Sequence, residues 1–341
     1  MAERFVSLYS QLTGTEIPTI RDGVPSFLGV PVARTKKDLA GADIAIIGVP
    51  YDRPAPAGRP AGQWDGYRDA PATTRRSSLR FRGYVPEYDL EVFDHLKVVD
   101  YGDAEIDDNH MQRSIDNVAR KVQDAVEAGC RPVTIGGFSP CASYAVAKGI
   151  AVATKGKIGV ISLDAHGDCL DAEPGKEHEP EKGREPNAAT WEARLWDHFS
   201  NIDPTRHVEI GMRGPRNLRQ MVQTYKSKGA HWYPSAAVRQ QGIDAICETA
   251  LPFAFDGTER TWIGLDMDVL DVGAVPDWGD EPLGLSGWEV TKLVHEAGRR
   301  GASGLSFVYV APHSGAVAAL VSYITVYYMA GLVLGQQRKD A

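Results

Sequence analysis

Cysteine is scarce in this chain. Four cysteines occur among 341 residues, and none of them forms a Cys-x-x-Cys pair. Their spacing matches no zinc framework, and reduced thiols are the ordinary state of so few, scattered cysteines. The first ten residues also lack the basic start and apolar core of a signal peptide. We therefore expect a cytoplasmic protein without a disulfide framework.

The chain also lacks an excess of positive charge, and it contains no linker-like sequence. The formal net charge is -8, which argues against a general nucleic-acid-binding surface. No stretch rich in Gly and Ser or in Pro divides the chain into two periodic regions. Because 43% of the residues are hydrophobic, the chain has enough of them to form one large core. We predict a single domain over residues 1–341.

One long uncharged segment, Ala316 to Gly335, has the length of a membrane span. Ser322, Thr325 and three tyrosines dilute its apolar character. We expect no membrane span here. The segment is instead predicted to be a final helix that covers a sheet and buries its other face at an oligomer interface.

Short apolar runs alternate with helical patterns along the chain. This alternation predicts an α/β fold with a mostly parallel sheet, whose strands are covered on both sides. The predicted strands are 44–48, 97–100, 132–135, 158–163, 207–210, 261–265 and 305–310. The predicted helices are 111–128, 141–154, 218–228, 287–298 and 316–334, the first capped by Asp108 or Asn109 and ended by Gly129.

Carboxylates follow two of the predicted strands. One apolar run leads into Asp164-Ala165-His166-Gly167-Asp168, and another ends in Asp266-Met267-Asp268. In an open parallel sheet, ligands bind just outside the carboxyl ends of the strands. Four carboxylates that converge there repel one another unless a cation lies between them. Oxygen ligands with one imidazole suit Mn, Ni, Fe or Zn, whereas either motif alone is also compatible with ordinary loop capping.

These motifs resemble those of the ureohydrolase family, which contains arginases, agmatinases, guanidinobutyrases and formiminoglutamases. Further segments that resemble family motifs in the family's order are Ile47–Asp52, Arg68–Pro71, Val98–Asp103 and Glu281–Ser286. The resemblance implies an arginase-like three-layer α/β/α fold and hydrolysis of amidine C–N bonds by a bridged pair of metal ions. It also implies a deeper metal at Asp164, His166, Asp266 and Asp268, and a second metal at Asp164, Asp168, Asp266 and a further His.

Three family positions are altered in this chain. Where the family has the further metal-binding His, this chain has Ser139 in Gly136-Gly137-Phe138-Ser139-Pro140. Asn187 matches the position of a proton-shuttling His, and Tyr309 matches a Glu that grips the substrate cation. A serine is a poor ligand, an amide carries no exchangeable acid proton near neutral pH, and a phenol offers no charge to a guanidinium. Phe138 and His313 are predicted at the rim of the pocket.

Losses in three different roles predict a degenerate subunit that is not catalytic by itself. We expect it to assemble with a catalytically intact, metal-dependent ureohydrolase paralogue in a hetero-oligomer. The family resemblance implies that this hetero-oligomer is a hexamer. It resembles the degenerate partner in two-subunit biguanide (metformin) hydrolases. This chain is expected to hold one divalent metal, Ni or Mn, or none, while the partner carries the metal pair. The alternatives are an active amidine hydrolase with a remodelled mononuclear site, and a non-enzymatic ligand-binding or regulatory protein.

Overall fold

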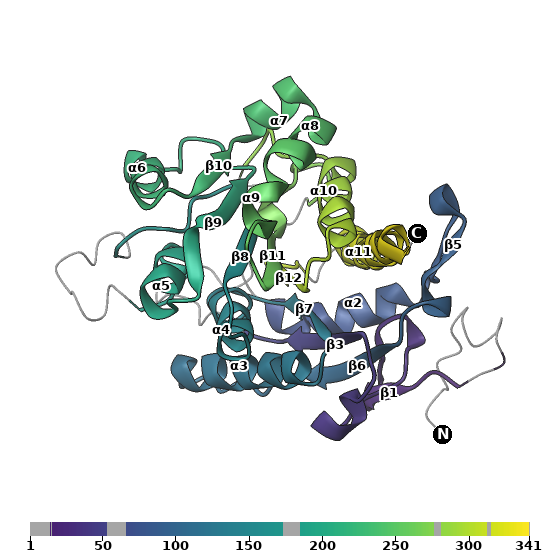
Figure 1. Cartoon of the computed structure of the whole chain (residues 1–341). Coiled ribbons are helices and arrows are strands. Elements are labelled where there is room, and N and C mark those ends of the chain that lie inside the picture. The colour runs from purple at the N-terminus through teal and green to yellow at the C-terminus, as the bar shows by residue number, and fades with distance from the viewer. Residues whose placement is uncertain are drawn as a thin grey trace.

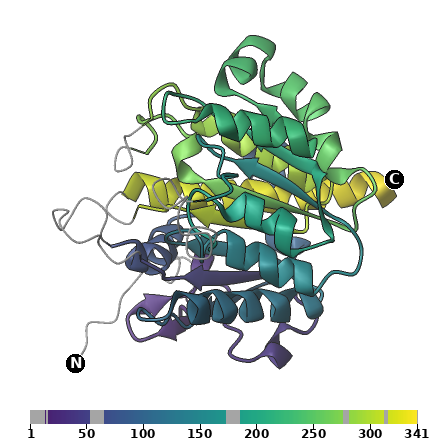
Figure 2. The same cartoon turned by 90° about the vertical axis from the view of Figure 1, so that its left-hand side faces the viewer.

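The chain forms one large sheet with helices on both of its faces (Figures 1 and 2). The computed structural model describes residues 14, 16–52, 66–172, 185–275, 281–311 and 315–340. The sheet has eight strands in the order β10-β9-β8-β11-β12-β7-β3-β6, and all neighbours in it run parallel. The predicted arginase-like three-layer α/β/α fold with a mostly parallel sheet is confirmed.

The strands of the large sheet are short and buried. They are β3 (Ile44–Val49), β6 (Val98–Asp103), β7 (Arg131–Gly136), β8 (Ile158–Leu163), β9 (Ile202–Ile210), β10 (His231–Tyr233), β11 (Arg260–Asp266) and β12 (Gly304–Val308). Every residue of β3 and of β8 is buried, which is why these runs are continuously apolar rather than alternating. Two small antiparallel ribbons lie outside the sheet: β1 (Thr19–Arg21) with β2 (Val24–Pro25), and β4 (Tyr84–Val85) with β5 (Leu90–Glu91).

The helices are divided between the two faces. Helices α3 (Met111–Glu127), α4 (Tyr144–Val152), α5 (Trp191–His198) and α6 (Arg219–Lys228) contribute to one buried apolar cluster. The other face is covered by α2 (Ala70–Ser78), α7 (Ser235–Gln241), α8 (Ile243–Thr249), α9 (Leu251–Phe255), α10 (Gly287–Arg299) and α11 (Gly315–Asp340). Two separate cores, one on each side of the sheet, result from this division.

Several elements differ from the sequence-based expectation. Strand β10 and the helices α2, α5, α7, α8 and α9 were not predicted, because they are short and their apolar pattern is weak. Helix α3 begins after His110, and the expected cap at Asp108 or Asn109 is wrong. The backbone N–H of Asn109 instead donates to Asp107. Gly129 does follow α3, with the positive φ of 88° that a helix-ending glycine adopts.

Helix α11 covers the predicted uncharged segment and continues to Asp340. By length and composition it could cross a membrane, but 72% of its most apolar window is buried inside the fold. Val317, Val321, Ile324 and Tyr328 are buried among the residues of the core around α10. A core helix explains this composition.

Candidate metal centre

The order of the strands brings four loops to one place. Strands β8, β11, β12 and β7 are successive neighbours, and all end at the same edge of the sheet. Asp164 follows β8, while Asp266 is the last residue of β11, next to it in the register Leu265 to Leu163. Tyr309 follows β12, and Phe138 follows β7. The two acidic motifs therefore meet where a ligand site of a parallel sheet is expected.

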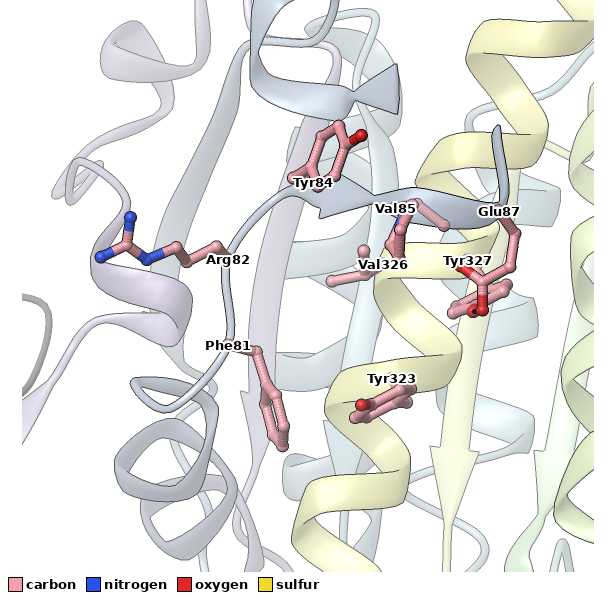
Figure 3. A pocket seen from close by; sticks show the side chains of 9 residues that line it. Phe81, Arg82, Tyr84, Val85, Glu87, Tyr323, Val326 and Tyr327 are labelled. Carbon is pink, nitrogen blue, oxygen red and sulfur yellow. Dashed lines mark hydrogen bonds between the residues drawn. The ribbon is translucent and has the colours of Figure 1, made fainter. Parts of the chain in front are cut away.

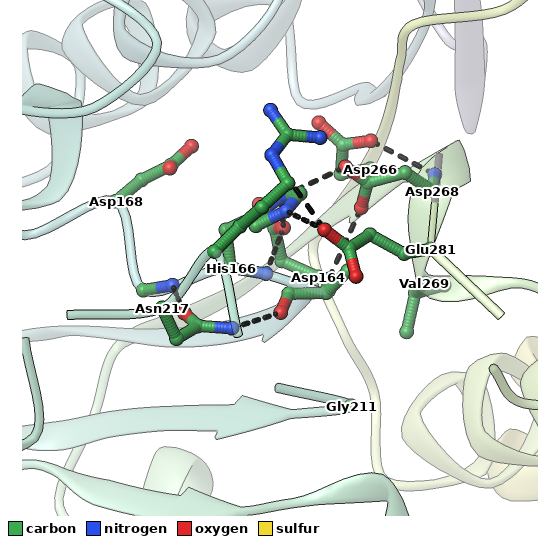
Figure 4. Close-up of polar contacts among 12 residues, drawn as sticks. Asp164, His166, Asp168, Gly211, Asn217, Asp266, Asp268, Val269 and Glu281 are labelled. Carbon is green, nitrogen blue, oxygen red and sulfur yellow. Dashed lines mark hydrogen bonds and ion pairs between the residues drawn. The ribbon is translucent and has the colours of Figure 1, made fainter. Parts of the chain in front are cut away.

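Three of the four residues predicted for the deeper metal come together. The ligand atoms of Asp164, His166 and Asp268 lie within 4.8 Å of one another (Figure 4). His166 Nδ1 lies 3.0 Å from Asp268 Oδ2 and 3.6 Å from Asp164 Oδ1. Backbone amides fix the carboxylates, since His166 N–H donates to Asp164 at 2.7 Å and Ala165 N–H donates to Asp268 at 3.0 Å. Asp266 accepts from the N–H of Asp268 at 2.9 Å.

The imidazole of His166 is turned so that it can serve as a ligand. Its Nε2 lies 3.4 Å from Glu281 Oε1, a carboxylate that can hold the ring proton on that nitrogen. The lone pair of Nδ1 is then directed at Asp164 and Asp268. Metal-binding histidines commonly donate their other N–H to such a carboxylate. The donor set and its orientation thus fit one divalent cation.

Burial and mutual repulsion perturb the acid groups of this site. Burial raises the pKa of Asp164 to about 7, and the charge of Asp268 adds to the increase. Burial raises the pKa of Asp266 well above its usual range, and the charges of Asp268 and Asp164 add to the increase. Burial disfavours a charged His166, but the carboxylates of Asp268 and Asp164 outweigh it and raise its pKa to about 11. Burial also opposes ionisation of Asp268, yet His166 lowers the pKa of Asp268 overall. Protons therefore occupy the place that a cation would take.

Residues that the sequence patterns did not single out build the scaffold of this site. Asn217 accepts from Gly167 N–H at 3.0 Å and donates to Ala165 O at 2.8 Å (Figure 4). Arg213 donates to the carbonyl oxygens of Asp268 at 2.8 Å and Glu281 at 2.7 Å. Arg213 is part of the sequence Gly211-Met212-Arg213-Gly214 directly after β9, and two glycines around an arginine at a strand end were the available signal.

Asp168 stands apart from this cluster. Its Oδ2 accepts a hydrogen bond from Trp191 Nε1 at 2.8 Å, and in Figure 4 it lies apart from His166 and Asp268. Burial and the charge of Asp164 raise the pKa of Asp168 well above its usual value. Ser139, at the position of the missing His, is buried and shares a hydrogen bond of 2.6 Å with Ser143. The residues expected around a second metal are thus engaged elsewhere.

Three aromatic side chains pack together beside the carboxylates. The ring centroids of Phe138 and Tyr309 are 4.3 Å apart, and Tyr67 lies 5.8 Å from Phe138 and 5.9 Å from Tyr309. All three pairs meet edge to face, the arrangement that ring quadrupoles favour. Phe138 was predicted at the rim of the pocket. It is 6% exposed, so it lies inside this aromatic cluster and not on an open rim. Tyr67 was not predicted, although it directly precedes the family-like motif Arg68–Pro71.

Little space remains next to the acidic pair. A cavity of about 10 Å³ is lined by Asp164, Asp266, Ser143 and Ser162 among others. This is about the volume that one water molecule needs.

Asn187 adds no contact to this cluster. Asn187 accepts from Ala189 N–H at 2.8 Å and donates to Glu185 O at 3.2 Å, so its amide shapes the turn before α5. His313, predicted at the rim, lies outside the described residues.

A second buried group, Glu192, His207 and Glu209, also brings potential ligand atoms together. Trp196 Nε1–H donates to His207 Nδ1 at 3.2 Å, which leaves the ring proton on Nε2, 3.2 Å from Glu192. Tyr225 donates to the other oxygen of Glu192. Glu192 Oε1, His207 Nε2 and both carboxylate oxygens of Glu209 are nevertheless buried without a hydrogen-bond partner among the described residues, so this network is only partly satisfied and stays a second set of potential ligands.

Fold and site together define a three-layer α/β/α protein with a candidate cation site at the carboxyl ends of its parallel strands. The chain belongs to the arginase family, whose model matches residues 42–332. Relatives include mitochondrial agmatinase of Gallus gallus, 28% identical over 290 residues, which cover 84% of this chain and 76% of the relative. Mitochondrial guanidino acid hydrolase of Homo sapiens is 26% identical over 303 residues, which cover 85% of this chain and 76% of the relative.

Solved structures share the fold. Formimidoylglutamase of Bacillus subtilis superposes with a TM-score of 0.76 at 23% identity, covering 92% of this chain and 94% of its own. Formiminoglutamase of Trypanosoma cruzi, a structure with Mn²⁺, gives a TM-score of 0.74 at 24% identity, covering 91% of this chain and 98% of its own. These relatives hydrolyse C–N bonds of guanidino and amidino compounds.

Proposed function

We propose that this chain is a degenerate ureohydrolase subunit that works with a catalytically intact, metal-dependent paralogue. The pair would hydrolyse a guanidine- or biguanide-type C–N bond, as metformin hydrolases do. One observation carries this proposal. Phe138, Tyr67 and Tyr309 fill the space beside Asp266 with three buried rings, where an active family member needs an open pocket.

The chemistry of the individual residues agrees with a lost reaction. Ser139 is paired with Ser143, and a neutral hydroxyl is a weak metal donor. Tyr309 is buried among the site carboxylates, which with burial raise its pKa well above the usual value. A neutral phenol attracts a guanidinium less than a carboxylate does. The side-chain amide of Asn187 accepts a hydrogen bond within a local turn, and an amide has no acidic proton to transfer near neutral pH.

The residues that remain would hold one divalent cation, nickel or manganese. Asp164, His166 and Asp268 would bind it, with Asp266 beside them, and Glu281 would fix the ring of His166. Such a cation activates water and polarises an amidine when it is bound. The paralogue would supply the complete metal pair.

The substrate class and the assembly rest on the family. Agmatinase and guanidino acid hydrolase act on guanidino compounds by name, and so does the guanidinobutyrase of Pseudomonas aeruginosa, which is 23% identical over 287 residues. A mixed ring, a hexamer in our proposal, keeps a subunit useful after its own site has closed, because its surface can still complete a neighbour's site. We place this assembly in the cytoplasm.

Purification tests the proposal. The chain purified alone with added Mn²⁺ or Ni²⁺ should release no urea from agmatine, guanidinobutyrate or metformin. The same chain co-expressed with an intact paralogue from its own genome should co-purify with it and raise the turnover of the paralogue at least about tenfold. A paralogue that is equally active without this chain would contradict the proposal.

A mononuclear amidine hydrolase is the second candidate, favoured by the assembled Asp164, His166 and Asp268. It predicts metal-dependent urea release by the pure chain that is lost in Asp268→Asn and kept in Glu209→Gln. The Glu209 variant is a matched control, since that carboxylate is equally buried but belongs to the separate group with Glu192 and His207.

A further inference from the structure

A cavity of about 160 Å³ lies beside α11, at a part of the surface that shares no residue with the metal centre (Figure 3). Its walls come from the segment after α2, from β4 and the short turn that follows it, and from α11. We propose that this cavity binds a small alkylated organic cation, such as a quaternary ammonium ion. The proposal does not depend on the function proposed above.

The cavity is walled by aromatic rings that neighbouring rings hold in place. Four of its residues are Phe81, Tyr84, Tyr323 and Tyr327. Phe81 meets Tyr323 edge to face at 5.0 Å, and Tyr323 lies parallel to Tyr327 at 6.3 Å. Tyr88 packs on Tyr327 from behind, with ring centroids 6.3 Å apart. Rings that neighbouring rings hold in place need little further ordering when a ligand binds, and aromatic walls of this kind attract cations.

A carboxylate at the edge of the cavity gives it negative charge. Tyr327 donates its hydroxyl proton to Glu87 at 2.6 Å, and this hydrogen bond lowers the pKa of Glu87. Glu87 is therefore ionised at neutral pH, and the oxygen of Tyr327 keeps its lone pairs for a cationic donor. The other charged residue of the lining, Arg82, extends away from the cavity in Figure 3.

One ring of the cavity already draws a cation of this chain. The guanidinium carbon of Arg80 lies 5.8 Å from the ring centroid of Phe81, within the range of a cation–π contact.

Size and wall chemistry select an alkylated ion. The volume is many times the roughly 10–15 Å³ that one water molecule needs, so it admits an organic ion of several heavy atoms. Val85 and Val326 are buried and form apolar walls. A strongly hydrated inorganic ion would lose more water than one carboxylate and two phenol oxygens replace, whereas alkyl groups gain from these walls.

Choline and its neutral isostere 3,3-dimethyl-1-butanol provide the test. Each is titrated into the full chain at constant ionic strength, and binding is followed by calorimetry. Choline should saturate one site with a Kd on the order of 1 mM, because a few cation–π contacts and one ion pair yield an affinity of that order. The isostere has the same shape without the charge, and it should bind about tenfold more weakly.

Two variants and a matched control complete the experiment. Tyr323→Leu should abolish choline binding, and Glu87→Gln should weaken it about fivefold; both residues are exposed, so the fold should tolerate the changes. Trp288→Leu removes an aromatic ring that is 61% exposed and lies outside the cavity, and it should leave binding unchanged. Equal binding of the neutral isostere, or choline binding that survives Tyr323→Leu, overturns the proposal. Binding to the separate chain that disappears in the assembled protein overturns it too, since a neighbouring chain then covers the cavity.

Discussion

At the scale of single residues, Tyr309 shows how the site is closed. Its backbone φ is 53°, in the left-handed region that residues other than glycine and asparagine seldom adopt. Such a conformation costs about 1–3 kcal/mol and persists only where the surroundings hold it. Here the backbone N–H of Tyr309 donates to Gly137 O at 2.9 Å, and its ring packs on Phe138. The hydrogen bond and the ring contact together hold the phenol over the carboxylates.

Restoring the family's residues should therefore reopen the second half of the site. In the variant Phe138→Asp, Ser139→His, Asn187→His and Tyr309→Glu, two rings are removed and one imidazole is added beside Asp164, Asp168 and Asp266. We expect the metal content to rise from at most one to two ions per chain, measured by elemental analysis after dialysis. Activity should stay low, because catalytic geometry must be held to about half an ångström. Tyr309→Phe serves as the control, and it should bind no additional ion.

A restored variant that still binds no second ion would contradict the placement of Ser139 at the missing ligand. In that case the loop after β7 follows a different path from that of the family, and the argument from the lost residue fails.

Glu281 offers a test of the remaining half. Its carboxylate lies 3.4 Å from His166 Nε2 and is the group that can fix the ring proton there. Glu281→Gln should weaken the binding of Mn²⁺ or Ni²⁺ by about 10–100-fold, the usual effect of removing such a partner. Glu192→Gln is the matched control, since it changes an equally buried Glu in the separate network. Equal affinities of the two variants would show that no cation binds at His166.

At the scale of elements, α10 and α11 cross with almost no space between them. A methyl group at Gly331 would lie 2.2 Å from the carbonyl oxygen of His295, and one at Gly298 would lie 2.7 Å from that of Tyr328. These glycines lie on facing turns and let the two backbones touch. The uncharged sequence of α11 is thus explained by its neighbours on the sheet and in the helical layer.

Gly331→Ala should destabilise the fold although alanine is the better helix former. The clash is with backbone, which cannot rotate away, and overpacking of this kind costs about 1–3 kcal/mol. Gly287→Ala on α10 is the control, because its added methyl group would meet Leu320 at an ordinary 3.5 Å. Urea unfolding of both variants measures the difference, and equal midpoints would contradict the close crossing.

The sequence predicted the long strands and helices because burial on both sides leaves a clear apolar run, as in Ile158–Leu163. It did not predict α7, α8 and α9, whose 7, 7 and 5 residues carry too few apolar positions for a periodic signal. Residues next to one another in a motif, such as Asp164 and His166, could be placed in a site from spacing alone. Tyr67, Trp191 and Glu281 could not, because their contacts join segments that are far apart in the sequence.

At the scale of the whole molecule, the buried acids differ in how they are neutralised. Asp100 and Asp103 share the buried guanidinium of Arg75, at 2.8 Å and 2.5 Å. Glu192 accepts from Tyr225 and lies 3.2 Å from His207. The centre around Asp164 has four aspartates and Glu281, which are faced by His166 and, from the surface, by Arg216, whose Nε lies 3.6 Å from Glu281. This surplus of acid distinguishes the metal centre from the other two networks.

The surplus predicts how the stability of the metal-free protein depends on pH. The folded-state pKa of Asp164 is about 7, above the ordinary value of 3.8, and that of Asp266 is raised as well. A raised carboxyl pKa stabilises the fold at low pH, and this contribution is lost as the pH rises through the folded value. Each pKa unit is worth about 1.4 kcal/mol, so the free energy of unfolding at about pH 8 should be lower than at about pH 5 by roughly 1 kcal/mol or more.

Added Mn²⁺ or Ni²⁺ should reverse this trend, because a cation binds the deprotonated ligands and stabilises most at the higher pH. Thermal unfolding with and without metal measures both effects. Asp266→Asn, which removes one titrating ligand, should flatten the pH dependence and lose most of the metal response. A metal-free protein whose stability rises between these two pH values would show that the carboxylates are neutralised from within the chain, and the case for a cation at this centre would be lost.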